Sequence, residues 1–243
     1  MKKLLAIFSI LVLATVSYLA WILITLPDVR HLVQTNPKTT ALMEQRAEEN
    51  GTKLQPLRSW TPYKGISIHL RNAVLVSEDS AFFQHSGFDW KQIQESAKRD
   101  WAEKRLVRGA STITQQLAKN LYLSTSKNPL RKIQEVFIAR ELERDLRKER
   151  ILEIYLNVIE WGDGIYGINA AANRYFGKSA GELNPEEAAV LAAMIPNPRR
   201  YTPNKNGAYL EKRKGEILDH MVQWHYLDRA DYEAARVRPV TYR

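Results

Sequence analysis

The chain of 243 residues contains no cysteine. This absence excludes disulfide bonds, thiolate metal sites and a cysteine nucleophile. The sequence also lacks internal repeats, low-complexity tracts and a series of strands with alternating apolar and polar residues. An oxidising compartment is compatible with this composition, although the missing cysteines do not establish one. What remains favours a mainly α protein with one large domain or two small ones.

Acidic residues are also in short supply, with 27 Asp and Glu against 36 Lys and Arg, which gives a net charge of +9. The imbalance is regional, because residues 98–150 hold 14 Lys and Arg but only 7 Asp and Glu. A local excess of this kind suggests an anionic partner, such as nucleic acid, lipid headgroups or a phosphorylated substrate. A solvated basic helix surface would give the same count.

One long apolar run is present, at the N-terminus. Lys2 and Lys3 precede 23 uncharged, mostly apolar residues, 4–26. A helix of that length spans roughly 30 Å of hydrocarbon. A cleaved signal peptide would have a shorter apolar region that ends at a small-residue site. The two lysines predict a cytoplasmic N-terminus with the rest of the chain outside. We therefore expect a transmembrane signal-anchor, a membrane-proximal linker and a folded domain over residues 1–26, 27–39 and 40–243.

Helix boundaries can be read at several points. Thr112 with Gln115 forms a Thr-x-x-Gln capping box, and the run Asn184-Pro-Glu-Glu is typical of a helix start. Pro129 opens a predicted helix that runs to about Leu146. Further helices are expected over residues 39–50, 67–76, 89–103, 148–161, 207–224 and 228–236, with a glycine-rich turn after residue 161.

Polar side chains that suit chemistry gather in three motifs. The first, EDSAFFQHSG, places Glu78 and Asp79 at a helix end before Phe82 and His85, which suggests a fixed turn in which an imidazole orders a carboxylate. Paired acids at a helix end are also common as solvated or capping groups. The second motif, GASTITQQLAKN, spans residues 109–120 and carries hydroxyls, amides and a lysine within about three helical turns. Amides suit sugar hydroxyls, and a lysine suits phosphate.

In the third motif, Arg131 and Lys132 lie four and three residues before Glu135, so that all three share a helix face. Taken alone, this pattern would be a surface ion pair of little energetic value. A fourth block, from Lys148 to Asn157, reads mainly as helix core, with those two residues as supports for the site.

Together these blocks resemble the peptidoglycan glycosyltransferases of glycosyltransferase family 51, and most of all the monofunctional biosynthetic transglycosylases. The likeness runs from about Trp60 to about Pro203, in the family's motif order. It implies a lysozyme-like helical fold with head and jaw lobes. It also implies the polymerisation of lipid II, an undecaprenyl-pyrophosphate-linked disaccharide-pentapeptide, into β-1,4 glycan strands at the bacterial inner membrane, with the catalytic domain in the periplasm.

The resemblance assigns Glu78 as the general base and Glu135 as the second essential carboxylate. The resemblance also implies that six residues contact the substrate: Ser111, Gln116, Lys119, Asn120, Arg131 and Lys132. With the other motif residues, the expected substrate-binding set also includes Asp79, Phe82, His85, Thr112 and Gln115. No cofactor is expected to be obligatory and no protein metal site is predicted, with a divalent cation (Mg²⁺ or Mn²⁺) optional at the pyrophosphate. The expected partners are lipid II, the growing glycan, the membrane and other cell-wall synthesis or division proteins, but no nucleic acid.

Two alternatives stay open at this point. A wall-cleaving glycosidase would need a protonated acid, which an apolar pocket favours, whereas nearby cations favour ionised carboxylates. A membrane-tethered module that binds nucleic acid or anionic lipid would not need Glu78 and Glu135. Ser124 and Lys127 have Ser-x-x-Lys spacing, but no Lys-Thr-Gly or Ser-Asp-Asn follows and the length leaves no room for a penicillin-binding domain, so we interpret this as a chance match and expect no transpeptidase activity.

Overall fold

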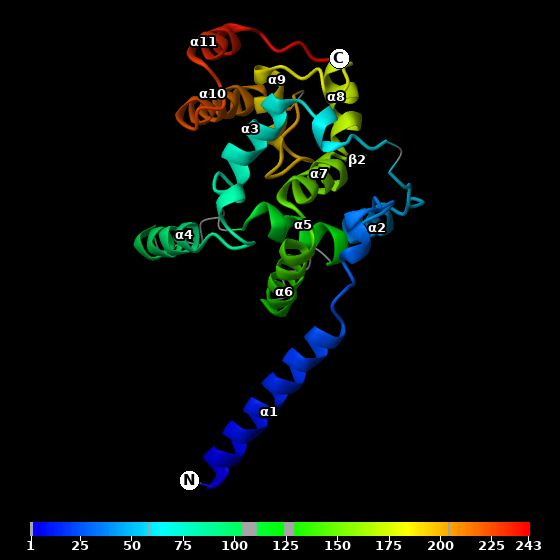
Figure 1. Cartoon of the computed structure of the whole chain (residues 1–243), viewed down its shortest axis with the longest axis vertical. Helices are drawn as coiled ribbons and strands as arrows, with labels where there is room; N and C mark the ends of the chain where they lie inside the picture. The colour runs from blue at the N-terminus through cyan, green and yellow to red at the C-terminus, as the bar shows by residue number, and fades with distance from the viewer. Residues whose placement is uncertain (1, 58, 104–110, 124–128, 204) are drawn as a thin grey trace.

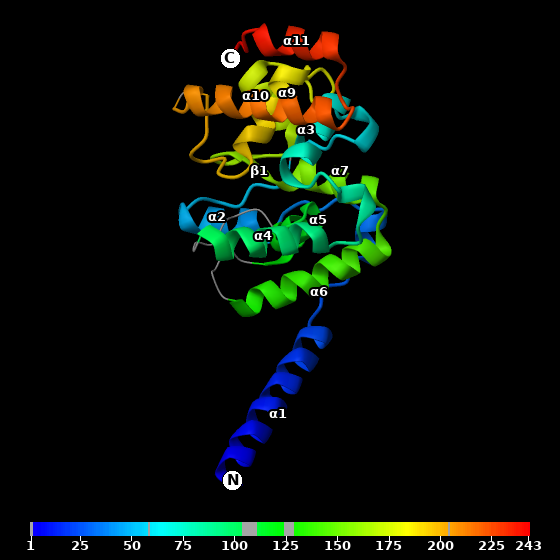
Figure 2. The ribbon, with the colours of Figure 1, turned by 90° about the vertical axis from the view of Figure 1, so that its left-hand side faces the viewer.

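The computed structural model describes residues 2–57, 59–103, 111–123, 129–203 and 205–243. These residues are mainly α-helical, as the sequence predicts. The first helix, α1 (Lys2–Ile24), projects from the rest of the molecule in both views (Figures 1 and 2). It is long and apolar enough to cross a membrane, and almost none of it is buried. This segment is therefore consistent with a single membrane anchor.

The helices beyond α1 form two tiers (Figures 1 and 2). The tier far from α1 is built around α9 (Pro185–Met194), all of whose residues are buried. It packs against α3 (Ile68–Glu78) and α10 (Gly207–Gln223), with α8 (Ile168–Phe176) and α11 (Arg229–Val237) completing the tier. The alanine-rich sequence of α9 allows the neighbouring helices to approach it closely on every side. Asn184 caps α9 in a full capping box with Glu187, which confirms the predicted start.

The tier next to α1 is organised by α5 (Ile113–Tyr122). This helix packs against α6 (Pro129–Asp145), α7 (Lys148–Val158) and α2 (Ala41–Glu49), and α4 (Trp90–Glu103) lies in the same tier. Short 3-10 turns at Arg30–Val33, Tyr63–Gly65 and Phe82–Gln84 join the elements. Since α3 ends where the tiers meet, its last residue, Glu78, faces α5.

The predicted helix over residues 148–161 is wrong at its C-terminal end. It stops at Val158, because Ile159 has extended backbone geometry. A short antiparallel hairpin follows, with strands β1 (Glu160–Gly162) and β2 (Ile165–Tyr166). Its return is fixed at Gly167, which has φ of +83° and lies so close to the Asn157 carbonyl that a Cβ would be 2.8 Å from that oxygen. A side chain could not occupy this position without moving the backbone.

Candidate active site

Glu78 ends α3 and is partly buried. Its Oε2 accepts a hydrogen bond from Gln116 Nε2 of α5 at 2.9 Å. The other end of that amide, Oε1, accepts from the Tyr155 hydroxyl of α7 at 2.8 Å, which fixes which way the amide points. Tyr155 is fully buried. Three helices therefore hold this carboxylate through one chain of side-chain hydrogen bonds.

Burial raises the pKa of the Glu78 carboxyl from 4.5 to about 7. The hydrogen bond from Gln116 and the charges of Arg213 and Lys119 act in the opposite direction, and the neighbouring Asp79 adds to the rise. The sequence argument expected nearby cations to keep such a carboxyl ionised, and here burial outweighs them. A carboxyl with a pKa near neutrality is suited to proton transfer at physiological pH.

The side chains of Asp79 and His85 do not join the hydrogen bonds that hold Glu78. They form a separate hydrogen-bonded pair. The Gly87 amide donates to His85 Nδ1 at 3.1 Å, so that Nε2 carries the proton and donates to the Asp79 carboxylate at 2.9 Å. The same carboxylate accepts from the Ile113 amide at the start of α5 at 3.0 Å. Asp79 is only 1% exposed. The expected imidazole–carboxylate pair exists, but it positions α5 relative to α3.

Phe82, Thr112 and Gln115 belong to the same framework. Phe82 is fully buried, with the Lys148 ammonium over its ring. Thr112 and Gln115 are buried in the predicted capping box of α5, where Gln115 Oε1 accepts from the Thr112 amide at 3.1 Å. Their side chains are thus engaged with the backbone.

A second carboxylate, Glu135 of α6, is held by cations. Arg131 Nη1 donates to its Oε2 at 3.2 Å, and Lys132 Nζ donates to its Oε1. Lys132 also reaches the Ser111 hydroxyl at 3.0 Å, which links α6 to the start of α5. Glu135 is 3% exposed, whereas the Lys132 side chain is about half exposed. The carboxylate therefore holds two cations, of which Lys132 is the more exposed.

Lys119 of α5 joins this group. Burial lowers the pKa of its ammonium, the carboxylates of Glu135 and Glu78 raise it, and the charges of Arg131 and Lys132 lower it. Lys119 on α5 is therefore within electrostatic range of both carboxylates and of the two cations on α6.

A cavity of about 160 Å³ is lined by Gln116 and Tyr155, the two residues whose hydrogen bonds lead to Glu78. On one side it is lined by Gln116, Lys119 and Asn120, which are three of the predicted substrate-binding residues. Its other walls include Arg46 of α2 and Glu160 of β1, whose charged atoms lie 3.4 Å apart. Polar groups of both charges around a small cavity suit a hydroxyl-rich ligand.

Several of these residues could not have been singled out from the sequence. Tyr155 reads as a core residue, and Arg46, Glu160 and Arg213 belong to no motif considered above. The supporting role predicted for Lys148 and Asn157 agrees with their contacts. Lys148 Nζ pairs with Glu143 at 2.7 Å, and the Asn157 side chain bonds both backbone groups of Thr61.

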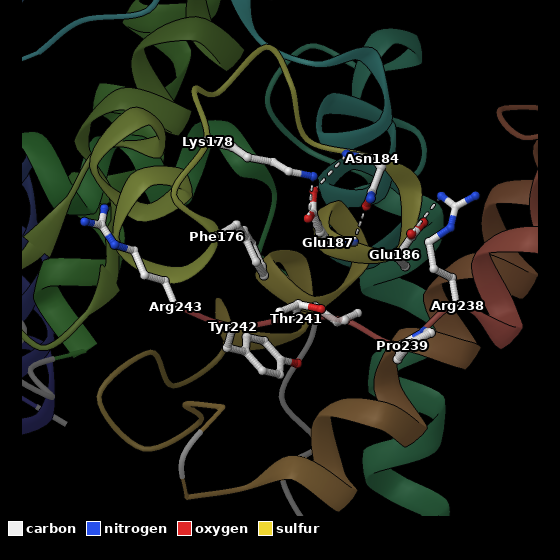
Figure 3. Close-up of a pocket in the computed structure, with 11 residues that line it drawn as sticks. Phe176, Lys178, Asn184, Glu186, Glu187, Arg238, Pro239, Thr241, Tyr242 and Arg243 are labelled. Carbon is white, nitrogen blue, oxygen red and sulfur yellow. Dashed lines mark hydrogen bonds and ion pairs between the residues drawn. The ribbon is translucent and has the colours of Figure 1, made fainter.

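A larger cavity, of about 410 Å³, lies away from this site under the C-terminal segment (Figure 3). It is lined by residues of α8, α9 and the last six positions of the chain. Its two acids are matched within the cavity, since Lys178 pairs with Glu187 at 2.7 Å and Arg238 with Glu186 at 2.9 Å. The lining of this cavity therefore contains two ion pairs and one further cation, Arg243.

Across the residues that the structure describes, no three His, Asp or Glu side chains gather as a metal site would require. Ser124, Lys127 and the first residue of the GASTITQQLAKN motif, Gly109, lie outside the described residues.

The geometry defines a helical protein with a carboxyl of near-neutral pKa on α3, a cation cluster on α5 and α6, and an N-terminal helix consistent with a membrane anchor. A family model described as transglycosylase matches residues 46–222, so this chain belongs to the transglycosylase family. The biosynthetic peptidoglycan transglycosylase of Nitrosospira multiformis is 48% identical over 76% of this chain and 82% of that protein. The namesake in Aromatoleum aromaticum is 47% identical over 80% of this chain and 85% of that one.

These matches confirm the predicted family, helical fold class and enzyme class: the chain is a peptidoglycan glycosyltransferase that acts in cell-wall synthesis. A crystal structure of penicillin-binding protein 1A from Haemophilus influenzae also matches, with 30% identity over 54% of this chain and 16% of that one. The TM-score of that match is 0.38, too low to say anything about a shared fold.

Proposed function

We propose that this enzyme polymerises lipid II into β-1,4 glycan strands and releases undecaprenyl pyrophosphate. The observation that supports this most is that two unlike groups both act on Lys119, which lines the cavity. Glu78 has a pKa near neutrality, and Lys119, Arg131 and Lys132 form a cation cluster around Glu135. Transfer from a pyrophosphate-linked sugar needs one group of each kind.

Glu78 is the proposed general base. The hydroxyl of the acceptor sugar attacks the anomeric carbon of the donor and loses its proton to this carboxylate. With a pKa of about 7, the carboxyl is ionised in a large fraction of molecules at neutral pH, yet basic enough to accept the proton. Gln116 keeps one carboxylate oxygen engaged and leaves the other for the hydroxyl.

The cation cluster is proposed to act on the leaving group. As the bond between the anomeric carbon and the phosphate oxygen breaks, both bonding electrons stay on the pyrophosphate, which leaves as an anion. Fixed cations stabilise that developing charge and no proton is needed. Lys119, Arg131 and Lys132 would supply this stabilisation, and Glu135 would hold two of them in place. The α-linked donor gives a β-linked product by a single inverting displacement.

A divalent cation would find few protein ligands in this site. Glu135 is already engaged by two cations, and no cluster of three ligating side chains exists in the described residues. Mg²⁺ is commonly held by substrate phosphates together with one or two carboxylates. We therefore place an optional Mg²⁺ or Mn²⁺ on the pyrophosphate itself, where it would add to the charge that the lysines and arginine supply.

The proposed setting is the bacterial inner membrane, with the N-terminus in the cytoplasm and the domain in the periplasm. The anchor α1 would keep the enzyme in the same plane as its lipid-linked substrate and beside other cell-wall synthesis or division proteins. Deletion of residues 1–26 should then lower turnover on membrane-embedded lipid II about tenfold or more, the scale of a lost local concentration. Turnover on a short-chain analogue in solution should change little; equal losses on both would give this segment a direct role in catalysis.

The direct test of the proposed function is incubation of the purified protein with labelled lipid II, followed by muramidase digestion of the product. A polymer that muramidase degrades to disaccharide units is expected. Release of reducing ends from purified sacculi, with no polymer formed, would instead make the protein a wall-cleaving glycosidase.

A further inference from the structure

Two further cavities lie beyond the cavity that Gln116 and Lys119 line. The nearer one, of about 130 Å³, meets the first at Arg46, which lines both. The next, of about 380 Å³, shares with the second the residues Met43, Gln55, Gly164 and Tyr166. The three neighbouring cavities are here named the side groove, and they lie along α2, residues 50–57 and 59, and the β1–β2 hairpin.

The inner end of the side groove adjoins the active site, because the first cavity is lined by Lys119 and by Gln116, whose amide bonds Glu78. The outer end is reached past the hairpin, where Ile165 and Ala170 form part of the wall. A group attached to a sugar bound at Glu78 could therefore follow this path without leaving the protein surface. The groove suits a branch of the substrate that points away from the reacting atoms.

The charge of the groove is mainly positive. Lys53 lines its middle section and Arg174 its outer section, and both are exposed. Within the described part of the chain, neither forms an ion pair with an acidic side chain. Glu160, at the inner end, is the acid in the lining, and it lies beside Arg46. Two uncompensated cations beside apolar wall residues such as Leu54 and Leu57 suit a carboxylate-bearing peptide.

We propose that the side groove binds the peptide branch of lipid II, with Lys53 and Arg174 attracting its carboxylates. This assignment rests on the proposed function. A peptide joined to the sugar through its amino end carries its free α-carboxylate at the far end, where Arg174 lies. The glycan backbone offers hydroxyls and amides and has no use for two unpaired cations, so the peptide is the better occupant.

The experiment compares two substrates on the full-length enzyme: lipid II with its pentapeptide, and the same lipid-linked disaccharide without peptide. The double variant Lys53→Glu/Arg174→Glu should lower kcat/KM about tenfold on the peptide-bearing substrate, mainly through KM, the scale expected for reversal of two exposed charge contacts. On the peptide-free substrate it should match wild type. The milder Lys53→Gln/Arg174→Gln should give a smaller loss with the same selectivity.

The control is Lys212→Glu/Arg229→Glu, which changes the net charge equally at two exposed positions on α10 and α11. It should affect both substrates equally, if at all. Equal losses for the groove variant on both substrates would assign the groove to the glycan or to lipid headgroups, and no loss on either would leave it without a ligand. Both results overturn the proposal, while failure of wild type to polymerise either substrate would refute the proposed function instead.

Discussion

Two carboxylates within electrostatic range of Lys119 have opposite surroundings. Glu78 is partly buried and accepts a hydrogen bond from one neutral amide, and burial raises its pKa to about 7. Glu135 is even less exposed to solvent but is ion-paired to Arg131 and Lys132. Two carboxylates that are shielded from solvent can therefore have quite different partners. This contrast is the basis for the proposed roles, which are proton transfer for the first carboxylate and the placement of cations for the second.

The largest expected effect is on catalysis at Glu78. Glu78→Gln keeps the shape and the neighbours of the side chain but removes the base, so turnover of lipid II should fall about 10²–10⁴-fold. Circular dichroism should show an unchanged helical fold. The matched control, Glu233→Gln at an exposed position of α11, should retain full activity. A Glu78→Gln enzyme with more than about a tenth of wild-type turnover would require a different base.

Removal of one cation of the cluster should have the second largest effect on turnover. Lys119→Ala and Arg131→Ala should each lower turnover about 10²–10³-fold, because each removes a charge that stabilises the leaving pyrophosphate. Lys212→Ala, at an exposed site on α10, serves as the control. If either active-site variant polymerises lipid II at the wild-type rate, the cation cluster is only a surface feature.

Substitution of the two carboxylates should change the free energy of unfolding in opposite directions. The folded state raises the pKa of Glu78, so its ionisation opposes folding above the unfolded pKa of 4.5. At pH 8 Glu78→Gln should stabilise the protein by at most about 3 kcal/mol, and the gain should fade as pH falls toward 4.5. Glu135→Gln removes ion-pair partners and should destabilise by about 1–3 kcal/mol. Thermal unfolding at pH 8 and pH 5 measures the stability change of both variants. If both variants were stabilised, or both destabilised, at pH 8, the contrast between the two carboxylates would be contradicted.

A smaller effect is expected at Gln116. Its hydrogen bond lowers the pKa of Glu78, so Gln116→Ala should move the rising limb of the rate profile to higher pH. Activity should recover partly in alkaline buffer. An unchanged limb with a uniform loss of rate would mean that the amide contacts the substrate and does not tune the base.

The parts of the fold that depend on local chemistry could be predicted from the sequence. The capping boxes at Thr112 and Asn184 and the face shared by Arg131, Lys132 and Glu135 need only a few consecutive residues, and the structure has all of them. The helix that stops at Val158 and the hairpin after it were missed, since helical periodicity does not show the close approach of Gly167 to the Asn157 carbonyl that fixes the turn.

The same distinction holds for the site. His85 does order a carboxylate, but whether that carboxylate is Asp79 or Glu78 depends on which way the chain turns after α3. Tyr155 and Arg46 reach the site from elements remote in sequence, and no local pattern marks them. The raised pKa of Glu78 likewise comes from burial between helices, which the charge pattern of the sequence alone misrepresents.

The most direct test of the contrast between the carboxylates is the pH dependence of kcat/KM for lipid II polymerisation by the wild-type enzyme. The rate should rise with pH through an apparent pKa near 7, as Glu78 loses its proton. The residual activity of Glu78→Gln should lack this limb, while Glu135→Gln should keep it at a lower rate. A limb near pH 4.5 in wild type, or one near 7 that persists in Glu78→Gln, would contradict the assignment of Glu78 as the base.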